Sequence, residues 1–277
     1  MNPEQLKSLV DRIPGPDERG TLAGIKAGEV EKIVAELHKG GPDVVTGLID
    51  MLVEPGGGDD TKPHYALHCL AVYVWKVGDG KTRREFADTV ASKIGGDRPI
   101  GVQKYLVREL QVAGGKEVAP TLGKALLVEE LCEPAAQALV AIGDGAAEQL
   151  RAALPKVKDK CRLTVIQNLG EVADAGSTGA LKKALGDEDR DIRVAALWGL
   201  VAIGDPASID AVLKADDKDG YERTQATDAC MSLADKLLAD GNKSEAKKIY
   251  SHLQKTRTDP SEKYVREAIQ KALAAQE

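Results

Sequence analysis

The residues most suited to chemistry lie in one predicted helix. His64 and His68 are one helical turn apart, Cys69 follows directly, and two aspartates lie just upstream. Two histidines at i and i+4 on one helix face can bind zinc. No third ligand stands at a suitable spacing, and Pro63 is typical of the first residue of a helix. We therefore predict packing or surface histidines here and no metal site.

Other catalytic signatures are missing from the sequence. Gly56-Gly57-Gly58 lacks the Lys-Ser/Thr pair of a phosphate-binding loop, and neither a GxSxG nor an HExxH motif occurs. The four cysteines are 63, 29 and 69 residues apart, so no CxxC pair exists. Each cysteine lies in an Ala/Leu-rich stretch, where a reduced thiol behaves as a small hydrophobe. The sequence predicts no catalytic residue and no cofactor.

Charge is unevenly distributed along the chain. Residues 61–120 contain ten Lys and Arg against six Asp and Glu, whereas residues 181–240 contain eight against thirteen. The basic segment suggests a surface for an acidic protein partner, with four candidate residues: Arg83, Arg84, Lys104 and Arg108. A nucleic-acid groove is the alternative. It is disfavoured because nine aromatic residues offer few stacking platforms and no more than two basic residues are consecutive.

The overall composition is that of a water-soluble chain. It has 277 residues, of which 30% are charged, and a formal net charge of −6. An acidic balance argues against general binding to nucleic acid or anionic membranes, and no apolar run approaches the roughly 18 residues of a membrane span. The start Met-Asn-Pro-Glu leads into a polar helix, which favours the cytoplasm. Export stays open if Met1 stands in place of a removed leader.

A thirteen-residue sequence pattern, called here the template, recurs along the chain, and the helices that it forms must position these side chains. It is clearest at Ile192–Gly204, where apolar residues recur at i, i+3, i+4, i+7 and i+8 and glycine ends the run. Further copies begin at Cys161, Leu131, Val102 and Ala66, so the spacings are 31, 30, 29 and 36 residues. Such a period accommodates two short helices and two turns.

Partner helices precede the template copies, at 118–127, 146–154, 178–185 and 208–213. Gly and Pro clusters separate the units, and no strand-type alternation competes. The sequence predicts an all-α fold, a right-handed superhelical α-solenoid of about six or seven helical hairpins.

Arginine recurs at the second position of the template. An acidic residue lies upstream of each: Asp159 before Arg162, Asp191 before Arg193, and Glu262 before Arg266. We expect such acid–arginine pairs to hold neighbouring repeats in register, with ligand binding on the concave face as the alternative.

The segment from Gly186 to Pro206 closely resembles the short bacterial HEAT repeat, a variant named after the phycobilisome bilin lyases. The segment around Leu233–Leu237, Ala246 and Tyr250 resembles a tetratricopeptide hairpin, in which Tyr250 packs on the preceding helix. We expect an N-terminal cap at 1–28, degenerate HEAT-like repeats at 29–115, and well-formed ones at 116–217. A tetratricopeptide-like hairpin plus a capping helix from Ser261 to Ala275 would complete the chain at 218–277.

The HEAT resemblance implies a non-enzymatic scaffold that binds a protein or peptide on its concave surface. A bilin-lyase-like enzyme or chaperone of cofactor attachment is the alternative, and a nucleic-acid-binding protein is a third. HEAT-type folds also include deoxyhypusine hydroxylase, whose di-iron site uses repeated His-Glu pairs. None of the four histidines here precedes a glutamate, so that activity is excluded.

Overall fold

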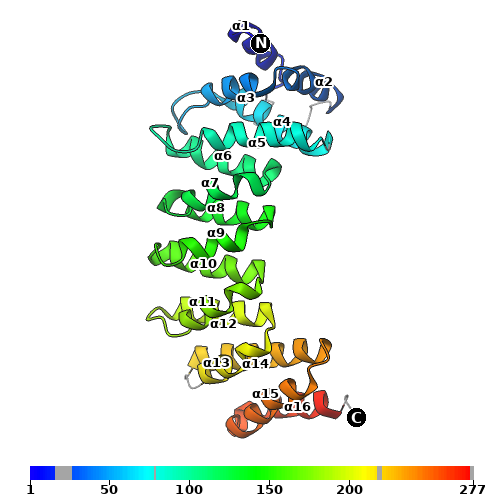
Figure 1. The fold of residues 1–277 in the computed structure, drawn as a ribbon, viewed down its shortest axis with the longest axis vertical. Coiled ribbons are helices and arrows are strands. Elements are labelled where there is room, and N and C mark those ends of the chain that lie inside the picture. Colours follow the sequence, from blue (N-terminus) through cyan, green and yellow to red (C-terminus); the bar gives the residue numbers. More distant parts are fainter. Residues whose placement is uncertain (16–26, 78, 217–219, 275–277) are drawn as a thin grey trace. The chain divides into compact units, whose positions relative to one another are not determined.

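The protein is an all-α solenoid. The computed structural model describes residues 1–15, 27–77, 79–216 and 220–274. Within these ranges the regular structure consists of sixteen α-helices and four 3-10 turns, without a strand (Figure 1). The predicted all-α class is confirmed. In the same ranges, no helix has the length and apolar character needed to cross a membrane.

The chain packs as two units, Met1–Val157 and Lys158–Glu277. The first unit contains nine helices: α1 (Pro3–Asp11), α2 (Ala27–His38), α3 (Gly41–Asp50), α4 (Thr61–Val77), α5 (Gly80–Ser92), α6 (Ile100–Ala113), α7 (Ala119–Ala125), α8 (Glu129–Ile142) and α9 (Ala146–Ala153). The second unit contains seven: α10 (Asp159–Val172), α11 (Thr178–Ala184), α12 (Arg190–Ile203), α13 (Ile209–Ala215), α14 (Gly220–Ala239), α15 (Lys243–Thr256) and α16 (Lys263–Ala274).

Longer and shorter helices alternate along much of the chain and form separate layers. In the first unit α6 packs on α4 and α8, while the short helices α7 and α9 pack on each other. In the second unit α12 packs on α10 and α14, and the short helix α11 closes a hairpin with α12 (Figure 1). Each hairpin therefore buries its apolar stripe only against its neighbours, as expected of a repeat protein.

Helix α12 shows how the template forms this structure. Asp189 caps its N-terminus by accepting a hydrogen bond from the Asp191 amide at 2.8 Å. Ile192, Ala196 and Leu200 are buried, and fully burying one such leucine contributes about 1.5–3 kcal/mol. Gly204 ends the helix in the left-handed region at φ 71°, and its amide donates to the Leu200 carbonyl.

The other template copies also form helices, with one change at a helix end. The copy from Leu131 forms α8 and ends at Gly143, whose φ is 76°. The copy from Cys161 forms α10, and here Ala173 occupies the left-handed position at φ 52° without being glycine. The copies at Ala66 and Val102 lie in α4 and α6. Gly78, the expected end of the copy at Ala66, lies outside the described residues.

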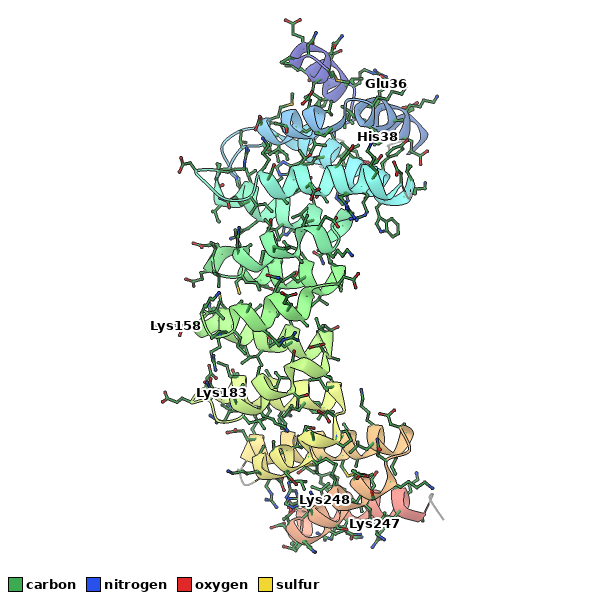
Figure 2. All side chains as sticks on the ribbon, viewed as in Figure 1. Glu36, His38, Lys158, Lys183, Lys247 and Lys248 are labelled. Atoms are coloured by element: carbon green, nitrogen blue, oxygen red, sulfur yellow. The ribbon has the colours of Figure 1, made fainter. Side chains whose placement is uncertain are left out.

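The segment that we predicted to form a tetratricopeptide-like hairpin folds into α14 and α15. Ala246 and Tyr250 are fully buried, and the Tyr250 hydroxyl donates to Asp235 of α14 at 2.8 Å. The predicted packing of Tyr250 on the preceding helix is therefore confirmed. Lys248 of α15 pairs with Asp210 of α13 at 2.6 Å, on the surface of this unit (Figure 2).

The two ends of the chain differ in detail from the prediction. The capping helix α16 begins at Lys263 rather than Ser261, because residues 260–262 form a 3-10 turn; Ala275 lies outside the described residues. At the N-terminus, Arg12 pairs at 2.9 Å with Glu36 of α2, the residue labelled in Figure 2. Residues 16–26 of the expected cap also lie outside the described residues.

Arginine–acid pairs do connect successive helices, but the predicted acidic partners are wrong. Arg193 binds both carboxylate oxygens of Glu222 on α14, at 2.7 and 2.8 Å, instead of Asp191. Asp191 pairs with its neighbour Arg190 at 3.2 Å. The reason is geometric, since the guanidinium of Arg193 reaches the facing helix rather than its own first turn.

The remaining pairs follow the same rule. Arg162 binds Asp187 at 2.8 Å, and Glu262 binds Arg223 of α14 at 2.7 Å rather than Arg266. Arg266 instead donates to backbone carbonyl oxygens, including that of Asp259. A hydrogen bond from Arg223 is the main reason that the pKa of Glu262 is lowered. These contacts fix neighbouring repeats in register.

Candidate functional site

The four basic residues proposed as a partner surface lie on two helices of the first unit. Arg83 is half-buried on α5, where it donates to the Ala113 carbonyl at 2.9 Å and pairs with Glu117 at 2.8 Å. Arg84 of α5 and Arg108 of α6 are exposed, and Lys104 of α6 is half-buried. Arg83 thus ties α5 to the end of α6, so the candidates for the proposed partner surface are reduced to Arg84, Lys104 and Arg108.

The two histidines of α4 bind different carboxylates. His64 Nδ1 lies 3.0 Å from Asp60, and the His64 ring meets the Tyr105 ring edge-on with centroids 4.2 Å apart. His68 Nδ1 lies 3.2 Å from both carboxylate oxygens of Glu109 on α6. In the described parts of the chain, no three His, Cys, Asp or Glu side chains are grouped to hold a metal ion.

A partly exposed histidine on α4, His68, faces a buried acid on α6, Glu109. The Glu109 side chain is 3% exposed, whereas that of His68 is 48% exposed. The hydrogen bond to Glu109 raises the pKa of His68, against the opposing effect of burial. Burial in turn raises the pKa of the Cys69 thiol, which keeps it protonated and a poor nucleophile.

The raised pKa of His68 predicts a pH dependence of stability. Protonated His68 stabilises the folded state fully below the unfolded-state pKa of about 6.5, and this contribution is lost as pH rises through the higher folded-state pKa. We expect the free energy of unfolding to fall over that window relative to the His68→Gln variant. Urea unfolding at several pH values measures the difference, and an NMR titration of His68 with a midpoint at or below about 6.5 would contradict it.

A surface depression lies on three longer helices of the second unit, α10, α12 and α14. It has a volume of about 670 Å³ and is called here the α10–α14 groove. Its main side chains come from α10, α12 and α14: Glu171, Asp191, Val194, Trp198, Tyr221 and Gln225. Sequence reasoning missed this site. The available signal was a tryptophan, one of only two, at an outward-facing template position.

Two exposed aromatic rings line the groove and are held in place. Trp198 is 36% exposed, and its Nε1 donates to the side-chain oxygen of Gln225 at 2.8 Å. Tyr221 is 55% exposed, and the Arg190 guanidinium carbon lies 5.4 Å from its ring centre. The bidentate pair of Arg193 with Glu222 joins α12 to α14 at this point. The rings are thus presented on fixed helices rather than on a loop.

Glycines form the floor of the groove because two helix backbones approach closely. A Cβ built on Gly170 of α10 would lie 2.9 Å from the Gly199 Cα of α12. On the other side, a Cβ on Gly199 would lie 3.0 Å from Leu181 of α11. A side chain at Gly170 would therefore push α10 and α12 apart, whereas one at Gly199 would first meet the flexible end of Leu181 and then the Gly170 Cα at 3.3 Å. The groove therefore depends on these two small residues.

The groove is apolar at its centre and acidic at its rim. Glu171 and Asp191 line it, and exposed Asp228 lies on α14 three residues after Gln225. Nearby, burial acts to raise the pKa of Asp187, but the Asp189 amide and Arg162 outweigh burial and lower it. Two cations lie next to the groove: Arg190, which already contacts Asp191 and Tyr221, and exposed Lys236, whose ammonium donates to the Ala202 carbonyl at 2.7 Å. The surface offers an apolar patch with an excess of carboxylates.

Comparison with known proteins places one family in the middle of the chain. Residues 147–231 match the family model for HEAT repeats, which confirms the predicted resemblance in the segment with the copies at Cys161 and Ile192. No curated protein matches the sequence.

Solved structures show only distant likeness. The complex of CpcE and CpcF of phycocyanin lyase from Nostoc sp. PCC7120 matches at 17% identity and a TM-score of 0.37, covering 92% of this chain and 94% of that one. A designed armadillo repeat protein in complex with the peptide (KR)4 matches at 17% identity and a TM-score of 0.38, covering 83% of this chain and 99% of that one. Human deoxyhypusine hydroxylase matches at 16% identity and a TM-score of 0.34, covering 98% of this chain and 96% of that one. Similarity at this level carries no information on function.

Proposed function

Because residues 147–231 are HEAT repeats, we propose that this protein is a non-enzymatic interaction module. It binds a protein or peptide partner in the α10–α14 groove. The observation that carries the proposal is the pair of exposed rings, Trp198 and Tyr221, over a groove of about 670 Å³.

The groove has the features of a binding hot spot. Tryptophan and tyrosine are enriched among the few interface residues that dominate affinity. The hydrogen bond of Trp198 to Gln225 fixes the indole before a partner arrives, so little side-chain entropy is lost on binding. Surfaces that run across successive repeats are also the usual binding surfaces of repeat proteins.

The chemistry of the groove supports binding rather than catalysis. The described residues that line it are apolar, aromatic, amide or carboxylate side chains, without His, Cys, Ser or Lys. Nucleophilic catalysis requires a nucleophile close to a base. The most reactive set elsewhere, on α4, has its histidines bound to Asp60 and Glu109 and its thiol pKa raised.

Affinity capture from the native host with matched variants tests this function. We expect Trp198→Ala to lose the specific partner, with binding weakened by at least about 30-fold, because hot-spot tryptophans contribute 2 kcal/mol or more. Trp75→Ala is the matched control, since Trp75 of α4 is 64% exposed and belongs to the other unit. Capture should be unchanged with Trp75→Ala.

A third variant tests the basic surface. It combines Arg84→Glu, Lys104→Glu and Arg108→Glu, and omits Arg83 because that residue has a structural contact. If this variant or Trp75→Ala loses the partner while Trp198→Ala retains it, the groove is not the interface. If all three variants retain the partner, the groove is again excluded.

A further inference from the structure

We infer that the partner segment of the α10–α14 groove is cationic, with apolar side chains flanked by arginine or lysine. This inference rests on the proposed function and specifies the chemistry of the partner. It follows from the charges at the rim, the apolar floor and an interaction that Tyr221 already makes.

The centre of the groove fits apolar side chains. Gly170, Gly199, Ala195 and Ala202 expose little beyond backbone and methyl groups, and the Trp198 indole stands beside them. A volume of about 670 Å³ exceeds that of a single side chain, so it accommodates two neighbouring apolar residues of an extended or helical segment. Two leucines are a suitable probe.

The rim selects positive charge. Glu171 and Asp191 line the groove, and Asp228 is exposed one helical turn from Gln225. The surrounding segment 181–240 has thirteen acidic against eight basic residues. Exposed carboxylates around an apolar patch attract a cationic partner and oppose an anionic one.

Tyr221 already binds a guanidinium within the chain. The Arg190 guanidinium carbon lies 5.4 Å from the Tyr221 ring centre, and Arg190 Nε lies 3.2 Å from Asp191. The ring and carboxylate thus form a site for a planar cation. An incoming arginine would use the same ring and carboxylate, so Arg190 acts as an internal competitor.

Trp198 fluorescence in the full-length Trp75→Phe variant provides the test, because Trp198 is then the only tryptophan. The probes are three blocked peptides, Arg-Arg-Leu-Leu-Arg-Arg and its glutamine and glutamate counterparts. We expect the arginine peptide to bind tightest, with affinity falling as salt rises. Arg190→Gln should tighten its binding about threefold.

Paired variants control for the net acidity of the protein. Glu171→Gln with Asp191→Asn should weaken the arginine peptide about tenfold. Asp88→Asn with Glu130→Gln removes the same charge from exposed positions on α5 and α8 and should leave binding unchanged.

The outcomes separate partner chemistry from function. If the glutamine or glutamate peptide binds as tightly as the arginine peptide, the cationic inference is wrong while the groove remains a binding site. If both paired variants weaken binding of the arginine peptide equally, the cationic inference is also wrong. If no peptide changes Trp198 fluorescence at about 1 mM, the inference fails, and host capture with Trp198→Ala decides the proposed function independently.

Discussion

Arg257→Met should destabilise the Lys158–Glu277 unit by about 3 kcal/mol, the cost of breaking a buried ion pair from one side. Arg257 is fully buried and donates to Thr227 Oγ1 at 2.8 Å and Thr256 Oγ1 at 3.0 Å. It also binds the carboxylate of Asp216, which is 3% exposed. Without the guanidinium, the partners that remain to this buried carboxylate among the described residues are His252, at 2.9 Å, and the Thr256 hydroxyl. Urea unfolding in the Trp75→Phe background, where Trp198 is the only tryptophan, measures the change through Trp198 fluorescence.

An exposed pair from the same unit serves as the control. Lys248 and Asp210 are 55% and 85% exposed, so Lys248→Met should cost no more than about 0.5 kcal/mol. Adding Asp216→Asn to Arg257→Met should recover part of the loss, because the uncompensated charge is then removed. A loss below about 1 kcal/mol for Arg257→Met would show that the buried pair contributes little.

Gly170→Ala should lower the free energy of unfolding by about 1–3 kcal/mol. In an ordinary helix interior the same substitution would add nearly 1 kcal/mol, since alanine has the higher helix propensity. Here the new methyl would meet the Gly199 backbone at 2.9 Å, and backbone cannot rotate away. The helices α10 and α12 must therefore separate, which also disturbs the floor of the groove.

Gly179→Ala is the matched control for this prediction. Gly179 lies on α11 of the same unit, and nothing lies within 4 Å of a Cβ built there. The control should leave stability unchanged or raise it by up to about 1 kcal/mol. If the two variants have equal stability, the close approach of α10 and α12 does not limit packing.

The helices of this protein could be predicted from the sequence because the signals that form them are local. Apolar spacing at three and four residues placed α12 within two residues of its observed start, and Gly204 marked its end. The same template located α8 and α10, and the Gly–Asp turns separated the hairpins. Apolar periodicity and glycine conformation act within one helix and its turn, so the order of residues is sufficient.

The candidate site could not be predicted, because its contacts join helices far apart in the sequence. Trp198 meets Gln225 across 27 residues, Arg193 meets Glu222 across 29, and His68 meets Glu109 across 41. The sequence by itself determined which residues are helical and which helix face is apolar. Only the tertiary structure decided which outward side chains become neighbours, since the axial shift and rotation between packed helices depend on the fit of all their side chains at once.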